Sequence, residues 1–108
     1  MSEDCIFCKI VGKEIESEFV YEDEEMIAFK DINPRAPIHV LFVSKKHIEK
    51  VSDVKGEDEK LLGRMVVAAK EYAAKKGVLN YKLQFNVGKK GGQEVFHLHL
   101  HLMGWREE

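Results

Sequence analysis

Three histidines, His97, His99 and His101, alternate with apolar residues near the carboxyl end of this 108-residue chain. Only two other histidines occur, His39 and His47. Successive side chains of an extended strand point to opposite faces, so this spacing predicts a row of imidazoles on one face. Such a row is a poor choice for stability, because each imidazole titrates near neutral pH and like charges repel. The pattern therefore favours chemistry over packing.

Cys5 and Cys8 form a Cys-x-x-Cys motif near the amino terminus. Two cysteines are too few for a disulfide framework, which leaves metal binding, redox chemistry or inert packing. The redox interpretation is the weakest, since no preceding strand or βαβ unit places the motif at a thioredoxin-like turn. Zinc prefers four nitrogen or sulfur ligands in a tetrahedron, so a zinc site needs two more ligands from elsewhere in the chain.

Hydrophobic periodicity and turn residues predict the elements that must position these side chains. Opposite the histidines, the last strand presents an apolar face of Phe96, Leu98, Leu100 and Leu102. The other expected elements are a short helix over 5–10 that ends at Gly12, a hairpin of 19–22 and 25–30, a buried strand over 38–43, a long helix between Gly56 and Gly77, and a strand over 81–87.

Strands outnumber helices in this pattern, and no βαβ unit repeats. Most connections are short enough for antiparallel pairing. We therefore expect the α+β class, with an antiparallel sheet of about five strands, one long helix and a short N-terminal helix. The length suits a single domain over residues 1–108.

Composition narrows the choice of partners. The formal net charge is −2, so no basic surface is expected for a nucleic acid polymer, although a small anionic ligand fits. No apolar run is long enough to span a membrane, and the acidic start differs from a secretory signal, so a cytoplasmic protein is expected.

The segment 97–103 is similar to the His-x-His-x-His signature of the histidine-triad (HIT) superfamily, followed by two hydrophobic residues. Other segments resemble the family in the same order along the chain: 5–10, 29–34, 36–39, 45–48, Asn86 and 91–93. The likeness is greatest to the Hint branch, the purine nucleoside phosphoramidases. It implies the HIT-like fold and a homodimer whose two sheets join, with a purine nucleotide beside each triad.

The resemblance also implies a reaction, in which the phosphoramidate bond of an adenosine 5′-phosphoramidate such as AMP-lysine is hydrolysed to release AMP. His99 is implied as the nucleophile, oriented by a backbone carbonyl and forming a nucleotidyl-histidine intermediate without a catalytic metal. His101, about 6.6 Å further along the strand, can hydrogen-bond the phosphate or the bridging atom. His39 is implied to face the triad and to share in proton transfer.

Further residues are implied as substrate contacts. Gly91 and Gly92 let the backbone approach anionic oxygens next to Gln93 and Asn86. Asp31 is expected to hold the ribose hydroxyls, and Ile32 to flank the purine. Three more apolar residues are candidates for the base pocket: Phe7, Phe29 and Ile27.

A subset of HIT proteins holds a structural zinc ion with Cys-x-x-Cys, a histidine after paired lysines and the first triad histidine. The matching residues here are Cys5, Cys8, His47 and His97. The chain departs from the animal Hint proteins at Glu94, where they carry a serine, and in its short carboxyl end. These departures leave the preferred leaving group open.

Three alternatives remain at this stage. Zinc bound to the triad itself would make turnover sensitive to chelators. Cleavage of dinucleoside polyphosphates would differ only in the leaving group. A nucleotide-binding adaptor would keep the pocket but not the reaction.

Overall fold

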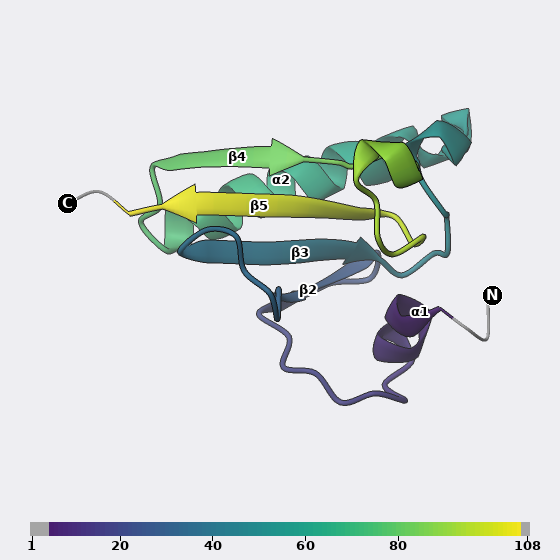
Figure 1. The fold of residues 1–108 in the computed structure, drawn as a ribbon, viewed down its shortest axis with the longest axis horizontal. Coiled ribbons are helices and arrows are strands. Elements are labelled where there is room, and N and C mark those ends of the chain that lie inside the picture. Colours follow the sequence, from purple (N-terminus) through teal and green to yellow (C-terminus); the bar gives the residue numbers. More distant parts are fainter. Residues whose placement is uncertain (1–4, 107–108) are drawn as a thin grey trace.

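The computed structural model describes residues 5–106, and a five-stranded antiparallel sheet forms its centre (Figure 1). The spatial order of the strands is β1-β2-β3-β5-β4. Every neighbouring pair is antiparallel, so the α+β prediction with about five strands is confirmed. The strand bounds are β1 Tyr21–Glu22, β2 Met26–Lys30, β3 Ile38–Ser44, β4 Asn80–Gln84 and β5 His99–Trp105.

The register of β3 against β5 decides which side chains share a face. Leu41 pairs with His101, and Val43 pairs with His99. Side chains of directly paired residues lie on the same face of a sheet, and so does every second residue along each strand. His39 therefore shares the face that carries His99 and His101.

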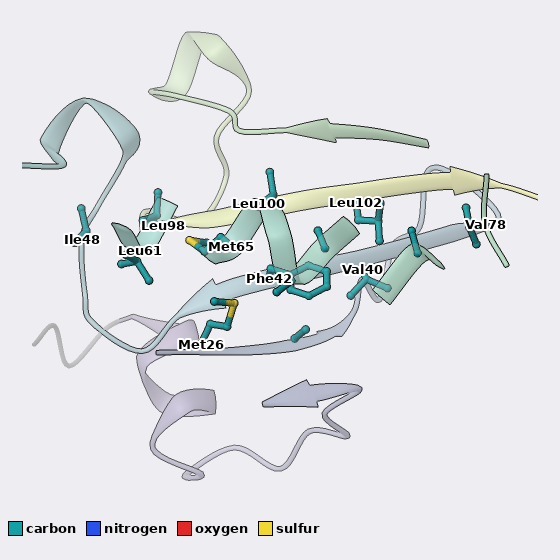
Figure 2. Close-up of a cluster of buried hydrophobic side chains, with 14 residues drawn as sticks. Met26, Val40, Phe42, Ile48, Leu61, Met65, Val78, Leu98, Leu100 and Leu102 are labelled. Atoms are coloured by element: carbon teal, nitrogen blue, oxygen red, sulfur yellow. The ribbon is translucent and has the colours of Figure 1, made fainter. Parts of the chain in front are cut away.

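Helix α2, Glu59–Lys75, covers the opposite face of the sheet (Figure 1). Its apolar stripe includes Leu61, Met65 and Ala69, and it packs on the even-numbered residues of β3 and β5. Figure 2 shows this cluster, in which Phe42 lies against Met26 and the leucines of β5. The labelled side chains are Met26, Val40, Phe42, Ile48, Leu61, Met65, Val78, Leu98, Leu100 and Leu102.

Helix α1, Ile6–Val11, lies over the histidine face and completes a second, smaller core. Cys5 is its N-cap residue, and the Cys5 Sγ accepts a hydrogen bond from the backbone N–H of Cys8 at 3.2 Å. The predicted helix end holds, since Gly12 is the C-cap. The buried members of this second core are Cys5, Phe7, Cys8, Ile10, Ile27, Phe29, Leu41 and Val43.

The histidine strand is shorter than predicted, because β5 begins at His99. The Leu98 N–H donates to the carbonyl of Ile48 at 2.6 Å, so the backbone here bonds to the loop after β3. The prediction for Phe96 is wrong: this side chain is 38% exposed and lies outside the core. The chain bends before β5, so Phe96 leaves the alternation of inward-facing side chains that the leucines of this segment keep.

The remaining boundaries shift only slightly. β4 ends at Gln84, so Val87 does not continue its inward face and is exposed. A 3₁₀ turn over Gly56–Asp58 precedes α2, and Gly77 follows its end with a φ of 70°, in the left-handed region that favours glycine. Within residues 5–106, no helix combines the length and apolar character needed to cross a bilayer.

A pair of glycine substitutions tests this packing. A Cβ at Gly104 in β5 would lie 2.7 Å from Cγ1 of the buried Val78, whereas a Cβ at Gly63 in α2 meets nothing within 4 Å. We expect Gly104→Ala to lower the free energy of unfolding by about 1–3 kcal/mol through overpacking. Gly63→Ala should raise it by about 0.5–1 kcal/mol, because alanine favours helix. Urea denaturation of both variants measures this, and equal effects would contradict the packing described.

Candidate active site

His99 and His101 on β5 and His39 on β3 form one cluster of imidazole rings. The ring centroids of His99 and His101 are 5.0 Å apart, and those of His39 and His101 are 5.2 Å apart. All three residues are buried, with 8% or less of their surface exposed. The cluster is thus shielded from bulk water. Hydrogen bonds and charges act more strongly in such a buried site than they do in water.

A backbone carbonyl sets the tautomer of His99. The His99 Nδ1 lies 2.7 Å from the carbonyl oxygen of His97. A carbonyl oxygen only accepts, so Nδ1 carries the proton and donates it to this bond. In the neutral ring Nε2 then keeps a free lone pair, which is the form that a nucleophilic histidine needs.

A second chain of hydrogen bonds assigns the protons of His39 and His101. The Arg35 backbone N–H donates to Nδ1 of His39 at 3.1 Å, so the neutral His39 ring carries its proton on Nε2. That Nε2 lies 2.9 Å from Nδ1 of His101 and 3.4 Å from Oδ2 of Asp31. His101 Nδ1 accepts the bond, and its Nε2–H is left to donate.

Burial keeps these rings neutral. It is the main cause that lowers the pKa of His101 from 6.5 to about 4, and the neighbouring rings of His99 and His39 make smaller contributions to the same shift. Burial is also the main cause that lowers the pKa of His99 and of His39, opposed in both by the Asp31 carboxylate. At neutral pH the cluster therefore offers one lone pair and one N–H donor without net charge.

The cluster opens into a cavity of about 370 Å³ between α1 and the sheet. One wall is apolar, and the other end holds the histidines with Asn86 and Gly92. Its lining residues include Ile6, Phe7, Ile10, Ile15, Glu16, Phe29, Lys30, Asp31, Ile32, Arg35, Leu41, Asn86, Gly92, Glu94, Val95, His99 and His101. A larger cavity of about 520 Å³ is lined by Tyr72, Lys76 and Arg106 among others, but not by His99 or His101.

Most residues expected to contact the substrate line this cavity: Asp31, Ile32, Asn86 and Gly92. Gln93 is not among the lining residues, and its side chain holds the loop together: Oε1 accepts from the Gly88 N–H, and Nε2 donates to the carbonyls of Glu49 and Val95.

In the apolar wall, Phe7 and Phe29 lie where expected. The expectation for Ile27 is wrong, since it is fully buried in the second core and does not line the cavity. Leu41 occupies the wall instead. Sequence reasoning missed Leu41, although its two-residue separation from His39 on the same strand was a usable signal.

Four side chains from three distant segments meet behind the cluster. The Cys5 Sγ lies 3.2 Å from Nδ1 of His97, and the Cys8 Sγ lies 3.1 Å from Nδ1 of His47. The two Nδ1 atoms are 3.1 Å apart. All four potential ligand atoms lie within 4.8 Å of one another, so the four residues lie within metal-binding distance.

The donor set suits zinc. Ligand bonds of ordinary length around tetrahedral zinc place two nitrogens about 3.3 Å apart and a nitrogen and a sulfur about 3.6 Å apart, close to the separations here. The Nε2–H of His97 donates to the Ser44 carbonyl at 2.6 Å, which leaves the Nδ1 lone pair for a metal. A carbonyl that orients a ligand histidine in this way is usual at metal sites.

Comparison with known proteins agrees with this geometry. Residues 4–108 match the family described as "Scavenger mRNA decapping enzyme C-term binding". A histidine triad protein from Clostridium difficile superposes with a TM-score of 0.93 at 39% identity, covering 100% of this chain and 96% of that one. The chain belongs to the histidine triad (HIT) family.

Two further relatives of this HIT protein are similar over nearly their whole length. Protein HitA of Neisseria gonorrhoeae is 50% identical, covering 94% of this chain and 96% of the relative. The purine nucleoside phosphoramidase of Escherichia coli K12 is 44% identical, covering 98% of this chain and 91% of the relative.

The lowered pKa of His101 makes the stability of this HIT protein pH-dependent. His101 has a pKa of about 4 when folded and about 6.5 when unfolded, so the unfolded chain binds more protons between these values. The contribution of neutral His101 to the free energy of unfolding is therefore complete above pH 6.5, and it is lost as the pH falls toward 4. At pH 5 we expect a loss of about 1–2 kcal/mol from this residue.

Urea denaturation at pH 7.5 and pH 5.0 measures this loss. His101→Gln cannot protonate at this position, so it should lose less stability than the wild type on acidification. Equal losses in the two proteins would show that His101 is not held neutral by burial.

Proposed function

We propose that this HIT protein is a purine nucleoside phosphoramidase. It hydrolyses the P–N bond of adenosine 5′-phosphoramidates, such as AMP-lysine, and releases AMP. The observation that carries the proposal is the bond from His99 Nδ1 to the His97 carbonyl, which leaves an unprotonated Nε2 in a ring that lines the cavity. The named activity of the Escherichia coli relative supports it.

In the first step His99 Nε2 attacks the α-phosphorus of the bound substrate. A bond forms between this nitrogen and phosphorus, and the P–N bond to the amine breaks. The departing nitrogen needs a proton, which neutral His101 cannot supply by itself. An anionic phosphate beside His101 favours its protonated form, so the pair of His39 and His101 takes up one proton with the substrate and passes it to the amine.

In the second step water attacks the phosphorus of nucleotidyl-His99. The new P–O bond forms as the bond to Nε2 breaks, and the His39–His101 pair accepts the proton that water releases. AMP leaves, and the bond to the His97 carbonyl keeps His99 in its starting tautomer throughout.

The cavity has separate places for the parts of the nucleotide. Asp31 is positioned to accept hydrogen bonds from the ribose hydroxyls, as its carboxylate lines the cavity beside His39. Ile32 is 91% exposed at the rim, where a bound purine would cover it. Phe7 and Phe29 offer the base an apolar wall on the other side.

The phosphate is assigned to the polar end. Gly92 has a φ of 92°, and Asn86 lies close enough to contact a Cβ at that position. The Asn86 amide is the proposed donor to phosphate oxygens. The backbone N–H groups of Gly91, Gly92 and Gln93 are already used, because they donate to the carbonyls of Gly88 and Lys89 within the turn. Gln93 contributes by anchoring the turn through its side chain.

Cys5, Cys8, His47 and His97 are proposed to hold a zinc ion. Bound zinc would cross-link α1 to the loop after β3 and to the segment before β5, and with four protein ligands it would have no open position for catalysis. The ring centroids of Phe7, in α1, and His99 are 5.1 Å apart.

We propose that the triad cluster itself holds no metal. Asp31, His39 and His101 lie within reach of one ion. Because Nδ1 of His39 accepts a hydrogen bond from Arg35, a metal on Nε2 would require the ring to lose both protons. Catalysis is therefore proposed to need no metal.

A homodimer is also proposed, with β4 as the joining edge. Within residues 5–106, β4 pairs only with β5, so its outer edge is open to a second copy. Exposed apolar side chains flank this edge, among them Leu79 and Trp105.

The nucleophile is tested by hydrolysis of adenosine 5′-phosphoramidate in the presence of a chelator. We expect wild-type protein to release AMP and His99→Ala to be slower by at least about a thousandfold, since the covalent route is lost. A rapidly quenched wild-type reaction should show the nucleotide attached to His99 by mass spectrometry. AMP release by His99→Ala at the wild-type rate would refute the mechanism.

Replacement of His47 separates the metal from the chemistry. We expect His47→Ala to lose bound zinc, measured by elemental analysis, and to unfold at a lower temperature. Turnover of the fraction that remains folded should persist, because His47 touches none of the groups proposed to act on the substrate. An unchanged metal content would contradict the zinc assignment.

A further inference from the structure

Glu94 occupies a fixed position at the edge of the triad cavity. The residue before it, Gln93, is bonded through its side chain to Gly88, Glu49 and Val95. The backbone on both sides of Glu94 is thereby anchored, while its own side chain is exposed and lines the cavity. Because the backbone is already anchored, the charge of Glu94 can interact with a bound ligand while the loop loses little conformational entropy.

A second cavity adjoins the triad cavity at Glu94. Ile6, Glu94 and Val95 line both the triad cavity and an adjoining cavity of about 270 Å³. Its other lining residues are Cys5, His47, Glu49 and Phe96, so two members of the cysteine–histidine cluster lie in its wall, and no lysine or arginine is among its lining residues in the described part of the chain. A group that extends from the phosphorus in this direction therefore meets apolar side chains and carboxylates.

The charged residues of the triad cavity also favour a ligand that carries a positive group. Three carboxylates line it, those of Glu16, Asp31 and Glu94, against the two cations Lys30 and Arg35. His101 adds no charge at neutral pH, since burial holds its pKa at about 4. An anionic phosphate enters this cavity more favourably when its substituent brings a positive charge of its own.

We propose that Glu94 selects phosphoramidates whose amine ends in a second, positively charged group. The alkyl stem of such an amine lies on Ile6 and Val95, which line both cavities, and its distal ammonium faces Glu94 at the entrance to the second cavity. Simple alkyl diamines have this chemistry. The proposal rests on the phosphoramidase activity proposed above and adds the residue that discriminates among leaving groups.

Three adenosine 5′-phosphoramidates with four-carbon amines test the selection. Their amines are 1,4-diaminobutane, butylamine and 4-aminobutyrate, which end in a positive, a neutral and a negative group. We expect the kcat/KM of wild type to be about fivefold higher for the diamine than for butylamine, as for an ion pair in partial contact with water. The aminobutyrate compound should be the poorest, and added salt should compress the series.

Substitutions identify the residue responsible. Glu94→Gln should bring the ratio of diamine to butylamine close to one, with a higher rate for butylamine because repulsion of the phosphate is relieved. Glu94→Lys should invert the series in favour of aminobutyrate. Glu16→Gln removes the same charge from the same cavity but lies outside the second one, so it should keep the wild-type ratio.

Equal kcat/KM values for the three substrates with wild type would overturn the proposal. So would a Glu94→Gln protein that keeps the preference, or one that loses activity equally on all three. Hydrolysis of the butylamine compound establishes the phosphoramidase separately from the selection. If none is hydrolysed, that activity fails, and dissociation constants measured by calorimetry still decide the selection: the same order supports it, and equal values overturn it.

Discussion

The hydrogen bond between His99 Nδ1 and the carbonyl of His97 is the interaction on which the site depends. It exists because His97 precedes the ladder of β5, so its carbonyl is available to the imidazole two residues further on. The same residue directs its own Nδ1 to the cysteines and its Nε2 to Ser44. His97 thus connects the proposed nucleophile, the cysteine–histidine cluster and the end of β3.

The two faces of the sheet divide the work between stability and chemistry. Helix α2 covers one face with a core of aliphatic side chains and Phe42, a rigid support for β3 and β5 (Figure 2). The other face carries the histidines and is covered by α1, a helix of six residues. A helix this short contributes little stability of its own, so its position depends on packing and on the cysteine–histidine cluster.

Neutral histidines solve an electrostatic problem in this cavity. A buried imidazolium beside the Arg35 guanidinium would be energetically costly. Burial lowers the pKa of His101 and His39, which favours the neutral form of both rings. In the proposed mechanism, the site takes up a proton when an anionic phosphate binds, so substrate binding and proton transfer are coupled. The proposed preference for substrates with a compensating cation rests on the carboxylates that line the cavity.

Hydrophobic periodicity in the sequence predicts the sheet, the two helices and the face on which His99 and His101 lie. These features follow from periods of 2 and 3.6 residues, which depend on local backbone geometry alone. The resemblance added the partners His39, Asp31 and Asn86. The tautomers of the histidines follow from the tertiary structure, because they depend on a carbonyl and an N–H that the backbone supplies at residues 97 and 35. The tertiary structure also places Leu41, not Ile27, in the cavity wall, and it places Phe96 outside the core. Strand register and the bend before β5 depend on contacts between distant residues, which hydrophobic periodicity does not encode.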